Sequence, residues 1–103
     1  MPGRAKAFDT FCPIGPCIAT DIDPNAVIIE TWINGVRRQS TSTAEMIFPV
    51  DDLVARVSEI MTLMPGDIIA AGTPAGIGPL APGDRVEVRI AGIGALANTV
   101  VKV

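Results

Sequence analysis

The sequence predicts an α+β fold that is mostly β, with five or six strands and one amphipathic helix folded into a roll or sandwich. Two observations carry this prediction. Short segments rich in β-branched residues alternate with Asn-Gly and Pro-Gly turn signals, which is typical of strands. Only one segment, 50–63, has the apolar spacing of an amphipathic helix. The length of 103 residues corresponds to one domain or to part of one.

The N-terminal segment predicts a loop that leads into a short extended piece at 17–20. Pro13 and Pro16 exclude a helix here, because proline lacks the N–H donor and clashes with the preceding helical turn. The next segment, 21–25, carries Asp, Pro and Asn in the arrangement of a tight turn. Its two aspartates fit turn chemistry better than a metal site.

A β-hairpin is predicted in the first half of the chain. Residues 27–33 are mostly β-branched and are expected to form its first strand. Asn34-Gly35 favours a type I′ turn, in which both central residues have positive φ. Residues 36–39 are expected to return antiparallel, and the polar segment 40–43 to connect the hairpin to the helix.

The helix predicted at 50–63 has one apolar face. Acidic residues in its first turn suit the helix dipole, and a Pro-Gly pair after its last residue ends it. Nothing on its polar face suggests chemistry. The apolar stripe consists of Leu53, Val54, Val57, Ile60 and Met61.

The second half of the chain contains the tripeptide Pro-Gly-Asp twice, at 65–67 and 82–84. Each copy predicts a type II turn before a strand, with glycine at the position of positive φ. The expected strands are an apolar one at 67–71 and an alternating one at 85–90. After a glycine-containing turn, a last strand is expected at 95–103.

The composition is unusually apolar for so short a chain. Hydrophobic residues make up 49% of it and charged residues 18%. A domain of this size has room for only a modest core. We therefore expect apolar surface that another chain or a missing segment covers, rather than an exceptionally dense core.

Charge and residue counts exclude several classes of function. The net charge of −3 argues against nucleic acid or an anionic membrane as partner. Arg37 and Arg38, as neighbours on one strand, point to opposite faces and form no basic patch. No apolar run reaches the length of a membrane span, and no signal peptide is recognised.

The cysteine and histidine counts limit the chemistry. Cys12 and Cys17 are expected to be reduced thiols of a cytoplasmic protein rather than a disulfide. Since the chain has no histidine, it contains neither a Ser-His-Asp nor a Cys-His apparatus, and no zinc site of its own. Lysine, carboxylates, hydroxyls, the backbone or a metal must carry any reaction.

A loop rich in glycine and proline, 72–79, is the most distinctive stretch, with Thr73 near its start. It has two interpretations. By itself it is more typical of a tight connection between strands, but a stiff loop with free N–H groups and one hydroxyl also suits an anionic or carbonyl ligand. It lacks the Gly-Lys-Ser/Thr ending of a nucleotide-binding P-loop. Lys6, similarly, is either a surface lysine or, in apolar surroundings, a fixed cation or a tuned base.

Three segments in series resemble the fumarylacetoacetate hydrolase family, particularly its 2-hydroxyhepta-2,4-diene-1,7-dioate isomerase and carboxymethyl-hydroxymuconate isomerase branch. They are RAKAFDTFCPIGP at 4–16, MTLMPGDIIAAGTPAGIGPLAPGD at 61–84 and VEVRIAGIGALANTV at 86–100, and the hairpin IETWINGVRRQ also fits. The resemblance covers nearly the whole chain. It implies the mixed β-roll of that family, usually dimeric, over residues 1–103 as the C-terminal part of the catalytic domain.

The resemblance also implies an activity and a site. Members of the family cleave, decarboxylate or tautomerise β-dicarbonyl and 2-hydroxy-dienoate acids with Mg²⁺, or with Mn²⁺ or Ca²⁺ in its place. Lys6 matches the catalytic lysine at the substrate carboxylate, and Thr10 a hydroxyl near the metal. Gly72 and Thr73 match the segment that holds a substrate oxygen. Glu87 matches a carboxylate that orients a histidine in the animal enzymes, although a solvated strand glutamate is the simpler interpretation.

The sequence departs from the family pattern in its metal ligands. The family binds its metal mainly through a Glu-x-Glu pair and a separate Asp, and this chain contains no Glu-x-Glu. We therefore expect a partial enzyme that binds metal poorly and is inactive alone, unless a complementary N-terminal segment or another copy supplies the carboxylates. The alternative is a non-catalytic oligomeric β-roll module.

Overall fold

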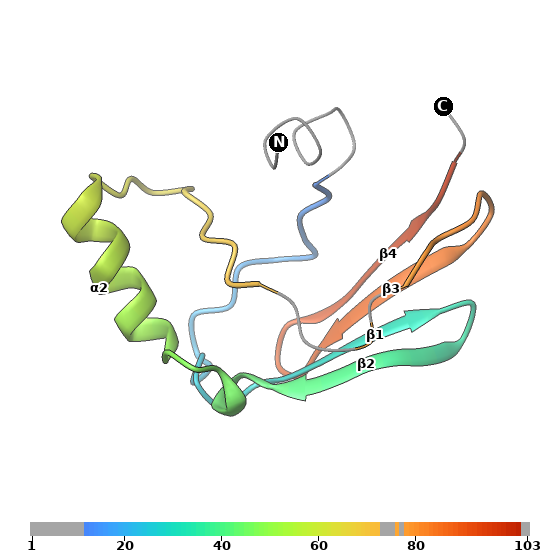
Figure 1. The fold of residues 1–103 in the computed structure, drawn as a ribbon, viewed down its shortest axis with the longest axis horizontal. Helices are drawn as coiled ribbons and strands as arrows, with labels where there is room; N and C mark the ends of the chain where they lie inside the picture. Colours follow the sequence, from blue (N-terminus) through green and yellow to red (C-terminus); the bar gives the residue numbers. More distant parts are fainter. Residues whose placement is uncertain (1–11, 73–75, 77, 102–103) are drawn as a thin grey trace.

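A computed structural model describes residues 12–72, 76 and 78–101. Within them lie four strands, one α-helix and one turn of 3-10 helix, arranged as Figure 1 shows. The predicted α+β fold, mostly β with one helix, is confirmed. The elements are β1 (Ile28–Ile33), β2 (Val36–Ser42), η1 (Thr43–Glu45), α2 (Val50–Ile60), β3 (Arg85–Ile90) and β4 (Gly94–Thr99).

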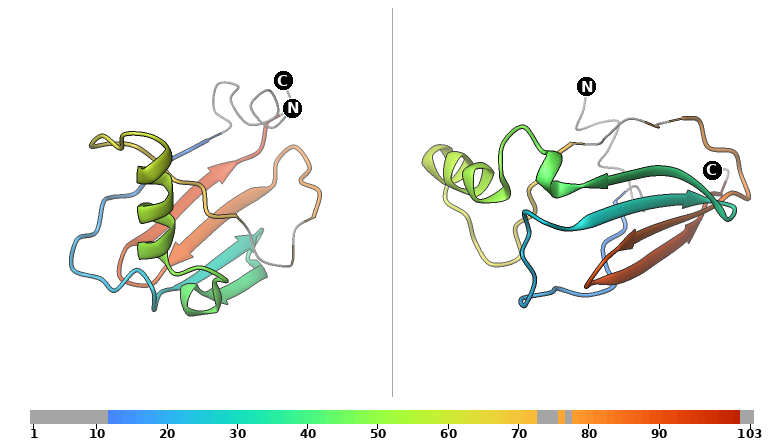
Figure 2. Two further views of the ribbon diagram at one scale, coloured as in Figure 1. Left: turned by 60° about the vertical axis from the view of Figure 1, so that its left-hand side comes forward. Right: turned by 90° about the horizontal axis from the view of Figure 1, so that it is seen from below.

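The four strands form one antiparallel sheet in the order β2-β1-β3-β4. Two hairpins, β1–β2 and β3–β4, lie side by side through the pairing of β1 with β3. The long connection between the hairpins carries η1 and α2. The helix lies at one end of the sheet and does not cover the middle of either face (Figures 1 and 2). The sheet therefore keeps a face that the described elements leave largely open.

The turn between β1 and β2 has the conformation that its sequence predicts. Asn34 has φ of 51° and Gly35 has φ of 80°, as a type I′ turn requires. The Asn34 side chain also ties this turn to the start of β3, because its Nδ2 donates to Asp84 Oδ1 at 2.9 Å and its Oδ1 accepts from the Arg85 N–H at 2.8 Å. One asparagine thus shapes a turn and joins the two hairpins.

The two Pro-Gly-Asp turns are confirmed as well. Gly66 has φ of 93°, and the Asp67 N–H donates to the Met64 carbonyl at 3.0 Å. The Asp67 carboxylate in turn accepts from the Met64 N–H at 2.8 Å. The turn at 81–84 repeats every one of these features, with Gly83 also at φ of 93°. The aspartate therefore closes each turn from both sides.

Several predicted boundaries were wrong. The helix ends at Ile60 rather than at 63, because Met61 already has extended φ and ψ of −144° and 157°. Strand β2 continues through the serines and threonines expected as a connection, since they pair with β1 up to Ser42.

The expected strands at 17–20 and 67–71 are not strands, and β4 spans 94–99 instead of starting at 95 and reaching the C-terminus. An apolar run becomes a strand only where a neighbouring edge offers hydrogen bonds. Over the described residues neither segment pairs with the sheet. The described part of the chain therefore has four strands rather than five or six.

The chain buries little of its apolar surface. Among the described residues only Val27 and Ile33 are buried hydrophobics, whereas thirteen large hydrophobic side chains are exposed. No residue of α2 is buried. The expectation of uncovered apolar surface, rather than a dense core, agrees with this distribution.

The register assigns side chains to the two faces of the sheet. Since paired residues of an antiparallel sheet share a face, Thr31 and its partner Val88 lie on one face, and Trp32 and its partner Glu87 on the other. The first face is mainly aliphatic and the second carries most of the charges of the sheet. No helix over the described ranges is long and apolar enough to cross a membrane.

Candidate functional site

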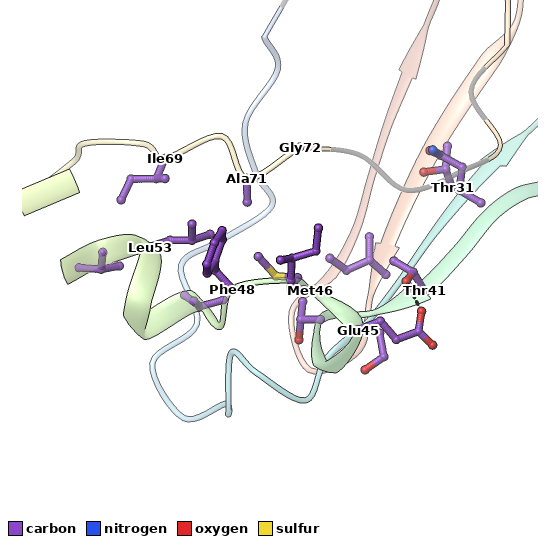
Figure 3. A pocket seen from close by; sticks show the side chains of 16 residues that line it. Thr31, Thr41, Glu45, Met46, Phe48, Leu53, Ile69, Ala71 and Gly72 are labelled. Atoms are coloured by element: carbon purple, nitrogen blue, oxygen red, sulfur yellow. Dashed lines mark hydrogen bonds between the residues drawn. The ribbon is translucent and has the colours of Figure 1, made fainter. Parts of the chain in front are cut away.

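A hollow of about 750 Å³ lies between the aliphatic face of the β1–β2 hairpin, η1, the start of α2 and the segment that leads into the loop at 72–79, the glycine loop (Figure 3). It is partly open to solvent, and its lining surface is mainly apolar. The residues that line it are Ile29, Thr31, Gln39, Thr41, Ser42, Thr43, Glu45, Met46, Ile47, Phe48, Val50, Leu53, Val54, Ile69, Ala71 and Gly72.

The segment before α2 places large apolar side chains in this hollow. Phe48 is 43% exposed, and Figure 3 shows it beside Leu53 and Met46. The guanidinium of Arg56 lies 4.3 Å from the centre of the Phe48 ring, on the helix side. Ile47 is 92% exposed although it lines the hollow. These residues were not predicted from the sequence to line a site. The signal that marks them is the run of three large apolar residues at 46–48, just before the helix.

The N-terminus of α2 is capped by a residue that is distant in the sequence. Asn25, in the predicted turn, accepts from the Val50 N–H at 2.8 Å and donates to Asp51 Oδ1 at 3.2 Å. Pro49, at the N-cap position, makes no side-chain cap. Because Asn25 replaces the missing local cap, the turn at 21–25 holds the helix at the edge of the hollow.

Six of the sixteen lining residues have polar side chains, and several of these are engaged in hydrogen bonds within the chain. The Thr41 hydroxyl donates to Glu45 Oε2 at 3.0 Å, as the dashed line in Figure 3 marks. Ser42 and Thr43 accept from backbone N–H groups of Ala44 and Val27, respectively. Glu45 is the one carboxylate among the lining residues. The hollow therefore suits an apolar partner or a mostly apolar ligand better than a metal ion.

Of the residues predicted to bind the substrate or the metal, the structure places only Gly72. It lies at the edge of the hollow with φ of 97°, a conformation that glycine adopts readily. The other three, Lys6, Thr10 and Thr73, lie outside the described residues. Whether they come together with Gly72 stays a prediction.

Glu87 belongs to the charged face of the sheet, opposite the hollow. Its carboxylate accepts from Arg89 Nε at 2.6 Å and lies 3.5 Å from Arg85 Nη1. Arg89 also stacks on Trp32, 4.2 Å from the ring centre. The glutamate is thus neither a simple solvated side chain nor part of the hollow. Its contacts give no support to a role beside a catalytic group.

Two carboxylates, Asp84 in the turn before β3 and Glu87 in β3, have a lowered pKa. The N–H of Ala81 and the side chain of Asn34 lower the pKa of Asp84 by hydrogen bonding. The hydrogen bond from Arg89 lowers the pKa of Glu87, and the nearby arginine charges act in the same direction. Both groups therefore hold their protons more weakly than in the unfolded chain.

These pKa shifts predict acid sensitivity. The usual pKa values are 4.5 for Glu87 and 3.8 for Asp84, and the folded-state pKa values are lower. The two carboxylates therefore stabilise the fold above the usual values, and this stabilisation is lost as the pH falls through the folded-state pKa values, because the unfolded chain then binds more protons than the folded chain. Melting temperatures measured from pH 6 to pH 2.5 should fall, and D84N and E87Q should flatten the decrease. E59Q, which removes a carboxylate with no partner in the described structure, is the control. An equally steep decrease in all variants would contradict the assignment.

The described residues do not fit a complete divalent-cation site. They contain no group of three or more His, Cys, Asp or Glu side chains placed to hold a metal ion. Cys12 and Cys17 are free thiols, and Cys17 Sγ donates to the Ile93 carbonyl at 3.6 Å. A hard cation needs several oxygen ligands, so the described part of this chain does not by itself provide its site.

Comparison with known proteins places this chain in a family. The model of the fumarylacetoacetate (FAA) hydrolase C-terminal domain matches residues 1–101. An uncharacterized protein of Methanocaldococcus jannaschii is 58% identical over 97 residues, which are 94% of this chain and 41% of that protein.

Two solved structures are also similar. The 5-carboxymethyl-2-hydroxymuconate delta-isomerase from Mycobacterium smegmatis has 49% identity and a TM-score of 0.91, covering 95% of this chain and 39% of the isomerase. Maleylpyruvate hydrolase from Sphingobium sp. SYK-6, in complex with manganese(II) and pyruvate, has 42% identity and a TM-score of 0.86. The match covers 91% of this chain and 37% of the hydrolase.

The chain thus spans about two fifths of the length of each of these three proteins. The match to the domain model extends over nearly all of its residues, and the fold agrees with that of the solved relatives. The chain belongs to the fumarylacetoacetate hydrolase family and corresponds to the C-terminal domain of that family.

Proposed function

We propose that residues 1–103 form the C-terminal part of a catalytic domain that acts on a 2-oxo acid, a 2-hydroxy-dienoate or a β-dicarbonyl acid, as an isomerase, decarboxylase or C–C hydrolase. The observation that carries the proposal is the family match over residues 1–101, combined with the position of Gly72 at the edge of the hollow. Support for a small 2-oxo acid comes from the solved relative that holds pyruvate.

Three residues of this chain are assigned to substrate binding. The ammonium of Lys6 is expected to pair with a substrate carboxylate, since a charge-assisted hydrogen bond is stronger than a neutral one. The hydroxyl of Thr73 and the backbone at Gly72 are expected to hold a second oxygen of the acid. Together they would orient the acid and stabilise negative charge that develops on its oxygens.

The divalent cation requires residues beyond these. A bound Mg²⁺ or Mn²⁺ would polarise the carbonyl of a 2-oxo acid. In the proposed assignment Thr10 is at most a minor ligand, and the carboxylate oxygens come from a complementary polypeptide segment or from another copy of the chain. The protein would act in the cytoplasm, with neither nucleic acid nor membrane as a partner.

An activity measurement on a reconstituted mixture tests this function. The full chain is mixed with the part of the Mycobacterium smegmatis isomerase that it does not cover, and tautomerisation of oxaloacetate is followed with and without Mg²⁺. The mixture should accelerate the reaction only when Mg²⁺ is present, whereas either component alone should not. Isothermal titration with Mg²⁺ accompanies the assay. Absence of both activity and Mg²⁺ binding in a mixture whose components associate would contradict the proposal.

The second candidate is a non-catalytic oligomeric β-roll module. The exposed hydrophobic side chains favour it, because an oligomer would cover them. Size-exclusion chromatography together with titration of Mg²⁺ and oxalate separates the two candidates. An oligomer that binds neither probe, even with the complementary segment, is the result expected for the module.

A further inference from the structure

Strand β2 contains a β-bulge at Arg38. The pairs Ile28↔Ser42 to Thr31↔Gln39 share one register, but Trp32 then pairs with Arg37. Arg38 is therefore the extra residue of β2, which no residue of β1 faces in the pairing. Such a bulge bends its strand and changes the direction of the groups at the extra residue.

The glycine loop meets β2 at this bulge. Gly76 has φ of 105°, and a Cβ atom built on it would overlap the carbonyl oxygen of Arg38. The same Cβ atom would lie 3.1 Å from Gln39 Cγ and 3.3 Å from the Arg38 carbonyl carbon. A carbonyl group of a paired strand cannot move aside as the end of a side chain can. Only glycine fits this contact without displacing the loop.

Two neighbouring glycines lack this constraint. A Cβ atom on Gly78 would have Arg38 Nη1, the end of a flexible side chain, at 3.8 Å, which is an ordinary contact. A Cβ atom on Gly72 would meet no atom within 4 Å. Among the described glycines of the loop, the close approach to β2 is therefore specific to Gly76.

We infer that Gly76 is a positioning residue. Because it has no side chain, its backbone packs directly against the carbonyl group of Arg38 in the bulge, and this contact holds the glycine loop against β2. Gly72, four residues earlier, lines the hollow together with Gln39, the residue next to the bulge. The contact thus sets where the start of the loop lies relative to the hollow. The consequence for ligand binding rests on the proposed function, in which Gly72 and Thr73 hold a substrate oxygen.

The variants G76A and G78A both add one methyl group to the same loop. Because Gly76 has a positive φ and Gly78 does not, G66A is the second control: Gly66 has φ of 93°, and a Cβ atom on it would meet no atom within 4 Å, so G66A adds the backbone strain without the contact. Amide hydrogen exchange and oxalate affinity are measured on the full chain with the complementary segment, well below the melting temperature. G76A should speed exchange at Gly72 while leaving strands β3 and β4 protected, and should weaken oxalate binding by about tenfold or more, because small displacements of binding groups have large effects. G78A should change oxalate affinity by less than about twofold.

The possible outcomes separate the inference from the proposed function. If the unmodified protein binds no oxalate, the proposed function fails, and the exchange at Gly72 alone decides the inference. If G76A changes neither exchange nor affinity, or if G78A has the same effect, Gly76 does not position the loop. A uniform rise in exchange over the whole sheet would show a general structural role instead, and would also overturn the inference.

Should G76A fail to fold, the unmodified chain still provides a test. A nuclear Overhauser cross-peak is expected between the Gly76 α-protons and the Gln39 γ-protons, because the Cβ position of Gly76 lies close to Gln39 Cγ. Its absence from the folded chain would contradict the contact itself.

Discussion

Replacement of Lys6 by methionine should weaken oxalate binding by about 10- to 100-fold. Methionine keeps most of the length and apolar character of the side chain but removes the ammonium. In the proposed site this group is the positive charge that this chain contributes to the substrate carboxylate. A charge-assisted hydrogen bond contributes roughly 1.5–3 kcal/mol, which corresponds to the expected loss.

The sequence offers a matched control, because the chain has only two lysines, Lys6 and Lys102. K102M changes the net charge by the same amount as K6M. Isothermal titration of oxalate into the chain with its complementary segment and Mg²⁺ compares both with the unmodified protein. Equal weakening by K6M and K102M would indicate a general effect of charge and would remove Lys6 from the site.

Replacement of Ile47 by aspartate should weaken association through the hollow by about 100-fold, because it places a charge where an apolar side chain would be buried. Ile47 is 92% exposed in the chain and lines the hollow, so its side chain is available to a partner. Burial of an isoleucine contributes roughly 1.5–3 kcal/mol, and a buried unpaired carboxylate adds a cost of its own. The effect should concern both self-association and binding of the complementary segment.

Ile18 provides the control for this substitution. It is 90% exposed, nearly the same as Ile47, but it does not line the hollow. Sedimentation velocity over a range of concentrations should show loss of the larger species for I47D and little change for I18D. If both variants associate like the unmodified chain, the hollow is not an association surface.

The parts of the fold that the sequence predicted correctly depend on local chemistry. Positive φ at Asn34 and Gly35 follows from the residues themselves, as do the two Pro-Gly-Asp turns and the alternating strand β3. In each case neighbours within a few residues decide the backbone conformation. The family resemblance, which depends on the order of three motifs, is confirmed by the match over residues 1–101.

The features that the sequence did not predict correctly, or did not predict at all, depend largely on contacts between distant segments. The apolar residues 67–71 looked like a strand but have no paired edge in the described structure. The cap on Val50 comes from Asn25, and the extra residue at Arg38 becomes visible only once β1 and β2 are in register. Local patterns carry no information on such pairings. For the same reason the hollow, assembled from three separate stretches of the chain at 29–31, 39–54 and 69–72, was not predicted.

The crystal structure of the chain with its complementary segment, Mn²⁺ and oxalate tests most directly whether Lys6 and Thr73 hold one small acid between them. The expected result is one oxalate at the edge of the hollow, with Lys6 Nζ and Thr73 Oγ1 each about 3 Å from its oxygens. An oxalate bound elsewhere, or a separation of these two atoms greater than a small dicarboxylate can bridge, would contradict the proposed site.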